Sequence, residues 1–350
     1  MTIRTLSSVD TAALARFDAV IDARSPGEFA LDRLPGAVNL PVLSDAERAE
    51  VGTIYVQESR HRARRLGAAY VARNIARHLE EALSDQPPGW QPLVYCWRGG
   101  QRSHAFATVL SQVGWPVTVL EGGYRTWRRH VTARLYDAEL PYRLVLLGGG
   151  TGVGKTEMLR LLAERGVQTL DLEALAEHRG SVFGAMGPQP SQKLFETRLV
   201  TELERLDQAE PVVVEAESSK IGDRVLPPSL WQAMATAPRI ELSAPAEARA
   251  DYLLRTYTDA LESPAELTNT LARLDNRVGR KRLAQWCDLA ARGEHRQLAL
   301  ALIEGHYDPA YTRSSRNDGQ IKLTAIELST ITPDLQSKVA AKIEGVVNSL

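Results

Sequence analysis

The sequence predicts an α/β protein with two successive α/β domains and a helical C-terminal portion. Three observations support this class. An apolar run that ends at Tyr95 enters a cysteine loop and then a helical pattern, and a second run over 143–147 enters a glycine-rich loop and another helix. From Ala246 to Ser349 the pattern is helical. We expect domains at 1–135, 136–245 and 246–350, with the last packed on the second; Pro141 marks the first junction.

Composition is that of an ordinary globular protein, with 350 residues, 44% hydrophobic residues and a net charge of −1. The two cysteines, Cys96 and Cys287, lie far apart in the sequence, which argues against a disulfide framework and for a reducing compartment. The start has no apolar signal core, and no stretch is long enough to span a bilayer. We expect a cytoplasmic protein with no membrane partner.

Short strands and turns open the chain. Ala19–Asp22 is typical of a strand, which ends at a turn containing Pro26 and Gly27, and a second short strand follows the Pro35-Gly36 turn. Residues 45–83 show helical spacing, and the predicted buried face consists of Ala68, Ala69, Val71, Ile75 and Leu79.

One stretch of this helical region is strongly basic. Between Gln57 and His78 only Glu58 is acidic, whereas six residues are arginine: Arg60, Arg62, Arg64, Arg65, Arg73 and Arg77. Such a cluster suits a phosphate backbone. A solvated helix face would explain it equally well.

The cysteine loop runs Val-Tyr-Cys-Trp-Arg-Gly-Gly-Gln-Arg-Ser from Val94 to Ser103. Cys96 would lie at the end of a buried strand, and Gly99 and Gly100 would let the loop curl into a nest of backbone N–H groups that attracts anions. With Arg98 and Arg102, these dipoles would hold Cys96 partly as thiolate, the nucleophilic form. A helix over 105–113 would point its N-terminus at the same place. A buried structural cysteine is the alternative.

Four landmarks together resemble a rhodanese domain: residues 22–29, the turn at 34–37, the Cys96 loop, and Glu121-Gly122-Gly123 with Trp127 after a strand at 117–120. The usual rhodanese loop has one residue fewer between cysteine and arginine. The longer spacing is that of cysteine phosphatases and arsenate reductases, and it favours a bulkier, tetrahedral phosphate derivative.

The second glycine-rich loop, residues 149–156, is a complete Gly-x4-Gly-Lys-Thr phosphate-binding loop between an apolar strand and an amphipathic helix. Its predicted phosphate ligands are Gly149, Gly152, Gly154, Lys155 and Thr156. Thr156 would also bind Mg²⁺. The neighbouring strand at 211–218 lacks the usual aspartate, so Glu215 or Glu217 would approach the metal instead.

A rhodanese-like domain followed by a phosphate-loop domain resembles the tRNA 2-selenouridine synthase family over nearly the whole chain. Residues 97–103, 179–184, 189–192, 215–218 and 306–309 carry the likeness, although Gln101 stands where the family usually has methionine. The resemblance implies that selenium from selenophosphate replaces the sulfur of 2-thiouridine at the tRNA wobble position. It also implies that geranyl diphosphate first places a geranyl group on that sulfur.

We expect the diphosphate at residues 149–156 and selenophosphate near Cys96, Arg98 and Arg102. Trp97 or Tyr124 would stack on the wobble base. Basic residues would bind the tRNA backbone, namely Arg60, Arg62, Arg64 and Arg65 with Arg277 and Arg280 from a second basic cluster at 273–282. Whether a nucleotide binds is left open by the sequence.

Two alternatives remain open. Arg249 and Arg255, which follow the phosphate loop where lid arginines would lie, suggest a nucleotide-dependent kinase fused to a sulfurtransferase. The other is a non-catalytic anion-binding module with an inert Cys96.

Overall fold

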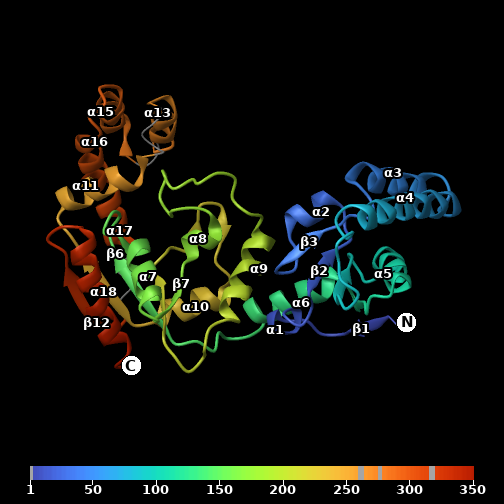
Figure 1. Ribbon diagram of the computed structural model, residues 1–350. Helices are drawn as coiled ribbons and strands as arrows, with labels where there is room; N and C mark the ends of the chain where they lie inside the picture. Colours follow the sequence, from blue (N-terminus) through green and yellow to red (C-terminus); the bar gives the residue numbers. More distant parts are fainter. Residues whose placement is uncertain (1–2, 259–263, 275–277, 315–319) are drawn as a thin grey trace. The chain divides into compact units, whose positions relative to one another are not determined.

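The computed structural model describes residues 3–258, 264–274, 278–314 and 320–350 (Figure 1). Contacts divide the chain into two compact units. Unit 1 contains residues 1–138 and 190–204, and unit 2 contains residues 139–189 and 205–350. Each unit holds its own parallel sheet, which confirms the α/β prediction.

The sheet of unit 1 has the strand order β1-β5-β4-β2-β3, and all its neighbours pair in parallel. Its strands are β1 (Arg4–Leu6), β2 (Ala19–Asp22), β3 (Ala37–Asn39), β4 (Pro92–Tyr95) and β5 (Thr118–Leu120). The central strand β4 is buried along its whole length, as expected for a parallel sheet covered on both faces. Strand β2 confirms the strand predicted at Ala19–Asp22.

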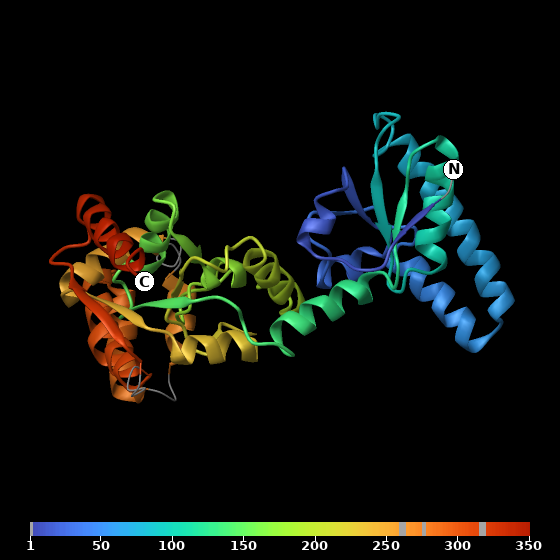
Figure 2. The same cartoon turned by 90° about the horizontal axis from the view of Figure 1, so that it is seen from below.

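Six helices of unit 1 precede residue 138: α1 (Thr11–Leu14), α2 (Pro26–Leu31), α3 (Asp45–Gln57), α4 (Arg60–Glu80), α5 (Gln101–Val113) and α6 (Tyr124–Leu135). Helices α3 and α4 lie side by side (Figures 1 and 2). The predicted buried face of this region is partly wrong, because Ala68 and Ala69 are exposed. The other three predicted residues are confirmed, because Ile75 is buried and Val71 and Leu79 pack against the same core. Ala63, Asn74 and His78 are also buried, and Asn74 donates to the carbonyl of Val42.

A seventh helix of unit 1 comes from much later in the chain. Helix α9 (Gln192–Leu203) packs on α6, where Trp127 Nε1 donates to Thr197 Oγ1 at 3.1 Å and Tyr136 donates to Glu196 at 2.7 Å. Glu196 is buried and also pairs with Arg128. These satisfied polar contacts specify where α9 binds within unit 1.

The sheet of unit 2 has the order β12-β11-β6-β8-β7 and is also parallel. Its strands are β6 (Leu144–Gly149), β7 (Gln168–Leu170), β8 (Val212–Glu215), β11 (Arg239–Ser243) and β12 (Lys322–Glu327), and β9 (Lys220–Ile221) pairs with β10 (Arg224–Val225) apart from this sheet. The helical prediction for residues 246–349 is wrong at β12. Residues 322–327 pair along β11 at the edge of the sheet instead.

The helices of unit 2 include α7 (Lys155–Glu164), α8 (Leu172–Ala176), α10 (Pro228–Thr236), α11 (Ala246–Thr256), α13 (Pro264–Ala272), α15 (Arg280–Ala291), α16 (His295–Leu302), α17 (Asp308–Ser314) and α18 (Pro333–Val347). A π-helical turn, η1 (Ile303–Tyr307), joins α16 to α17. Helices α7 and α18 pack apolar side chains against the sheet, whereas α13, α15 and α16 form a separate small core around Trp286. Within the described residues, no helix has both the length and the apolar character needed to cross a membrane.

Candidate active sites

Cys96 lies directly after β4, at the carboxyl end of the sheet, as predicted. Its Sγ lies 3.2 Å from Ser103 Oγ in the first turn of α5, and its carbonyl accepts a hydrogen bond of 2.8 Å from the N–H of Tyr124. The thiol is only 3% exposed. Because α5 begins at Gln101, the free N–H groups of its first turn lie next to the cysteine loop and favour an anion there.

Two glycines allow the loop after β5 to touch the cysteine loop. A Cβ atom on Gly123, whose φ is +59°, would lie 2.1 Å from the carbonyl oxygen of Cys96. A Cβ atom on Gly99, whose φ is +64°, would lie 2.7 Å from the carbonyl oxygen of Leu120. The Gly122-Gly123 landmark therefore supports the backbone of the cysteine loop.

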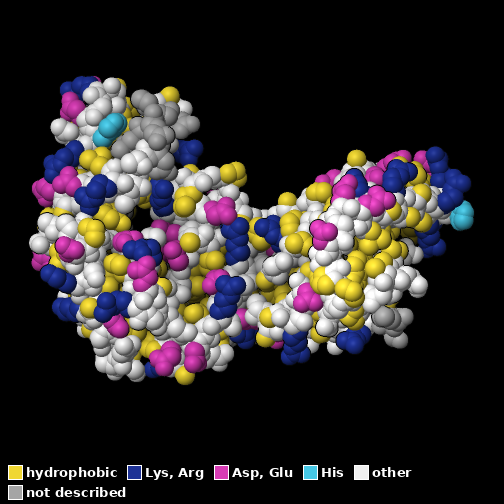
Figure 3. All heavy atoms as spheres, viewed as in Figure 1, with side chains coloured by type: hydrophobic (Ala, Val, Ile, Leu, Met, Phe, Trp, Pro, Cys, Tyr) yellow, Lys and Arg dark blue, Asp and Glu magenta, His cyan; other side chains and the backbone are white. Residues whose placement is uncertain are grey.

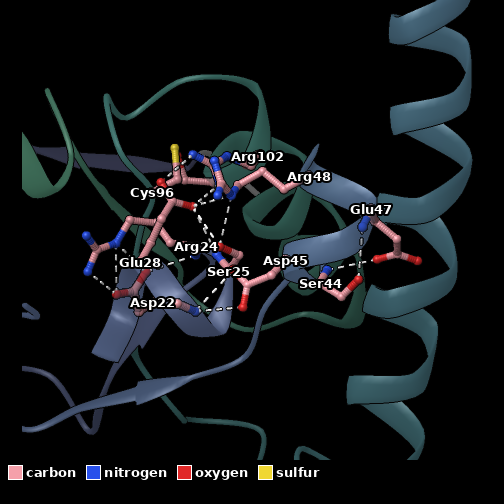
Figure 4. A network of polar contacts seen from close by, with 12 residues as sticks. Asp22, Arg24, Ser25, Glu28, Ser44, Asp45, Glu47, Arg48, Cys96 and Arg102 are labelled. Atoms are coloured by element: carbon pink, nitrogen blue, oxygen red, sulfur yellow. Dashed lines mark hydrogen bonds and ion pairs between the residues drawn. The ribbon is translucent and has the colours of Figure 1, made fainter. Parts of the chain in front are cut away.

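The two arginines of the loop differ in their surroundings. Arg98 is exposed, whereas Arg102 donates to Glu28 from α2 at 2.8 Å (Figure 4). Ser25 at the start of α2 accepts from Arg48, so three elements meet beside the thiol. The predicted anion ligand Arg102 thus already has an acidic partner.

An open cavity of about 800 Å³ adjoins the cysteine loop within unit 1. Its wall contains basic and aromatic side chains and two acidic ones. The lining residues are Arg24, Glu28, Leu31, Asp32, Arg48, Gly52, Trp97, Arg102, Tyr124, Ser191, Gln192 and Lys193. The last three, at the start of α9, were not predicted for this site. Their position at the start of a helix far from Cys96 in the sequence carried no signal that they approach the thiol loop.

The two predicted stacking aromatics play different parts at this cavity. Tyr124 is 2% exposed, donates to Asp32 at 2.7 Å and lies beneath the guanidinium of Arg24, 4.2 Å from its ring centre. Trp97 packs against Tyr124 at 5.1 Å between ring centres and is only half-buried. Trp97 is therefore the more accessible of the two rings, and Tyr124 packs against it.

The phosphate loop follows β6 and leads into α7 at Lys155, as the motif predicts. Gly149, Gly152 and Gly154 all have positive φ, which lets the loop curl. Lys155 Nζ donates to the carbonyl of Gly149 at 3.1 Å, and Thr156 Oγ1 donates to Glu173 at 3.1 Å. If a phosphate group bound in the loop, the ammonium group of Lys155 would donate to it in place of the Gly149 carbonyl.

Acidic side chains gather beside this lysine. Glu215 ends β8, is fully buried, and neither carboxylate oxygen has a hydrogen-bond partner among the described residues. Burial raises the pKa of Glu215 well above its usual value, and the charge of Glu173 adds to the rise. Burial and Glu217 raise the pKa of Glu173 to about 7, although Lys155 opposes them. Burial likewise raises the pKa of Glu217.

These oxygens suit Mg²⁺, although within the described ranges no three His, Cys, Asp or Glu side chains form a group that could hold a metal ion. Mg²⁺ commonly takes only one or two protein oxygens and completes its shell with water and substrate phosphates. The Thr156 hydroxyl and the unpartnered side chain of Glu215 fit that role.

Two buried donors beside the phosphate loop were not predicted as part of it. Arg249 on α11 forms a double hydrogen bond with Asp308 at 2.7 Å and donates to the carbonyl of Thr151. Gln336 on α18 places Nε2 where it would be 2.7 Å from a Cβ atom on Gly154. Arg249 Nε and Gln336 Nε2 are buried without a hydrogen-bond partner in the described part of the chain, so both can donate to a bound group.

The predicted tRNA ligands on α4 are all exposed: Arg60, Arg62, Arg64 and Arg65. Arg62 pairs with Glu58, and Arg60 lies over the ring of Tyr55. Figure 3 shows basic side chains gathered at the end of α3 and α4. Arg280 is exposed at the start of α15, whereas Arg277 lies outside the described residues.

Comparisons with known proteins agree with this two-part organisation. A family model for the tRNA 2-selenouridine synthase AAA domain matches residues 142–336, and a rhodanese-like domain model matches residues 9–130. A tRNA 2-selenouridine synthase of Azotobacter vinelandii is 31% identical over 360 residues, which cover 93% of this chain and 95% of the relative.

Two further relatives carry the same description. The protein of Salmonella newport is 33% identical over 327 residues, which cover 83% of this chain and 87% of the relative. The protein of Nitrosomonas europaea is 37% identical over 243 residues, which cover 68% of this chain and 63% of the relative, so this match spans less than two thirds of that protein.

Proposed function

Because this chain belongs to the tRNA 2-selenouridine synthase family, we propose that it converts 2-thiouridine at the wobble position of tRNA into 2-selenouridine. Geranyl diphosphate and selenophosphate are the two co-substrates. The observation that supports the proposal is that two separate glycine-containing loops, one at Cys96 and one at residues 149–156, each lead into the N-terminus of a helix. Each loop follows a strand of a parallel sheet, where phosphate ligands commonly bind.

The first step takes place at the phosphate loop. The sulfur of 2-thiouridine attacks C1 of geranyl diphosphate, so that a C–S bond forms, the C1–O bond breaks, diphosphate leaves and the base loses its N3 proton. Lys155 and the N–H groups of the loop stabilise the charge that develops on the leaving diphosphate. Mg²⁺ held by Thr156 and Glu215 would supply further positive charge there.

The second step takes place at Cys96. Its thiolate attacks C2 of the geranylated base, a bond from C2 to Sγ forms, and geranylthiolate leaves and takes up a proton. The selenium of selenophosphate then attacks C2 and displaces Cys96. Water finally cleaves the P–Se bond and releases phosphate, so that no oxidant or reductant is needed. Arg98 and Arg102 bind the phosphate oxygens of the donor.

The substrate base would stack on Trp97, while Lys193 and Arg48, which line the same cavity, would bind the negative backbone. The exposed arginines of α4 would bind more distant phosphates. This division suits a wobble base, because single-stranded loops present unstacked bases to aromatic side chains.

The decisive experiment incubates the protein with tRNA that carries 2-thiouridine, adds each donor alone and both together, and identifies the digested nucleosides by mass. Geranylated nucleoside with geranyl diphosphate alone, and selenonucleoside with both donors, are the expected products. The kinase alternative predicts steady ATP hydrolysis or phosphorylation of a small substrate instead. Its two suggested lid arginines hold other contacts, Arg249 with Asp308 and Arg255 with the carbonyl of Ile331.

A further inference from the structure

We propose that an apolar slot in the helical part of unit 2 binds the hydrocarbon chain of the prenyl diphosphate and selects its length. This inference rests on the proposed function and adds the place where the chain lies. The slot has a volume of about 70 Å³ and is partly open to solvent. Five segments line it: the phosphate loop, the loop before α9, and helices α11, α13 and α16 with the following η1 turn. Their lining residues are Thr151, Ser181, Phe183, Leu253, Leu254, Tyr257, Leu267, His295, Leu298, Ala299, Leu302 and Tyr307.

The slot begins at the phosphate loop itself. Thr151 belongs to both, and a Cβ atom on Gly152 would lie 3.0 Å from Leu253 Cγ and 3.1 Å from the carbonyl oxygen of Arg249. Helix α11 therefore packs directly on the loop, and its Leu253 lines the slot. A ligand that spans both places needs phosphates at one end and an apolar body at the other.

The walls favour a hydrocarbon over a nucleobase. No Asp, Glu, Lys or Arg is among the described lining residues, and most of the lining is leucine or aromatic. Burial raises the pKa of Tyr307 and that of Tyr257, so both phenols stay neutral. A base would bring several donors and acceptors that need partners, whereas an isoprenoid chain needs none.

Two sequence motifs that the phosphate loop leaves unexplained find a place here. Ser181 and Phe183 come from residues 179–184, and Tyr307 comes from residues 306–309. The next residue, Asp308, holds Arg249 on the phosphate loop. The second motif thus joins the wall of the slot to the support of the loop.

The test measures binding of geranyl, farnesyl and dimethylallyl diphosphate and of inorganic diphosphate by calorimetry. Each buried CH₂ group adds about fourfold to affinity, so geranyl diphosphate should bind at least tenfold more tightly than inorganic diphosphate. Ala299→Phe fills the slot and should abolish that preference without changing the affinity for inorganic diphosphate. Gln297→Phe adds the same ring on an exposed position of α16 and should behave like the parent.

A second variant covers the case in which Ala299→Phe does not fold. Phe183→Ala enlarges the slot and should shift the preference from geranyl toward farnesyl diphosphate by at least threefold. Equal binding of geranyl and inorganic diphosphate by the parent, or an unchanged preference in both slot variants, would overturn the proposal. The proposal would also be overturned if the parent binds ATP and Ala299→Phe weakens that binding. If the binding preference holds while no geranylated nucleoside forms, the proposed function fails and the slot stands.

Discussion

Arg102 Nη1 donates to Glu28 Oε2 at 2.8 Å, which joins the cysteine loop to a helix that begins 75 residues earlier in the sequence. Burial raises the pKa of Glu28, but the hydrogen bond and charge of Arg102, with the N–H of Ser25, outweigh burial and leave that pKa below its usual value. Glu28 is therefore ionised at neutral pH. It offsets part of the charge that Arg102 would offer an incoming anion.

Glu28→Gln should increase the affinity of the cysteine loop for inorganic phosphate and selenophosphate several-fold, because Arg102 is then uncompensated. It should also cost about 1 kcal/mol of unfolding free energy at pH 7. Because the pKa of Glu28 is lower in the native state than in the unfolded state, its ionised form stabilises the fold above the unfolded pKa. The difference in unfolding free energy between variant and parent should therefore shrink as the pH falls below 4.5. Urea unfolding at several pH values and phosphate titration measure both effects. Glu58→Gln, in an exposed pair with Arg62, is the control.

Cys96→Ser should abolish selenium incorporation and leave geranylation and tRNA affinity nearly intact, because a serine hydroxyl supplies no thiolate. Nucleoside mass analysis measures each product separately. Cys287→Ser, on α15 in unit 2, controls for loss of a thiol elsewhere and should keep full activity. Normal selenium incorporation by the Cys96 variant would exclude Cys96 as the nucleophile.

Lys155→Ala should slow geranyl transfer at least tenfold, a loss of about 1.4 kcal/mol or more in transition-state stabilisation. The reason is that the variant loses the charge directed at the leaving diphosphate. Single-turnover rates with saturating geranyl diphosphate separate this effect from weaker binding. Lys342→Ala removes an exposed lysine of α18 and should leave the rate unchanged; a Lys155 variant with the same rate would place the diphosphate elsewhere.

Glu215→Gln should make the protein more stable than the parent at pH 8, with a gap that closes toward pH 5. The pKa of Glu215 is raised in the native state, so ionising this buried carboxyl destabilises the fold as the pH rises above its unfolded value. Urea unfolding across this pH range tests the sign. The same variant should weaken the dependence of geranyl transfer on Mg²⁺, measured with EDTA and added metal. A difference in stability that does not vary with pH would contradict a raised pKa of Glu215 in the native state.

Replacing Arg62, Arg64 and Arg65 together by alanine should weaken tRNA binding and flatten its log–log salt dependence by up to about 2 units. Each arginine that meets a phosphate displaces condensed counterion. Filter binding over a salt series measures the slope, and phosphate affinity at Cys96 should not change. A control triple of Arg160, Arg165 and Arg296, all exposed in unit 2, carries the same charge change. If the parent and the α4 variant show the same slope, these arginines do not bind tRNA and simply form a solvated helix face.

Local patterns in the sequence determined both glycine-containing loops. An apolar strand, glycines that permit positive φ and a following helix are all contained within about twenty residues around Cys96 and again around Lys155. Such features depend on backbone chemistry near each residue, so they can be recognised without knowledge of distant partners. The strand at Ala19–Asp22 was predictable for the same reason.

Contacts between distant segments were decided only by the tertiary structure. The pairing of Arg102 with Glu28, the position of α9 on α6, the strand β12 and the slot beside Thr151 each join residues far apart in the sequence. Amphipathic spacing identified Val71, Ile75 and Leu79 on the buried side of α4, but it also assigned the exposed Ala68 and Ala69 to that side, because a small side chain fits a buried or an exposed position. What covers a surface depends on shape and on polar partners such as Glu196 and Thr197, which sequence spacing does not encode.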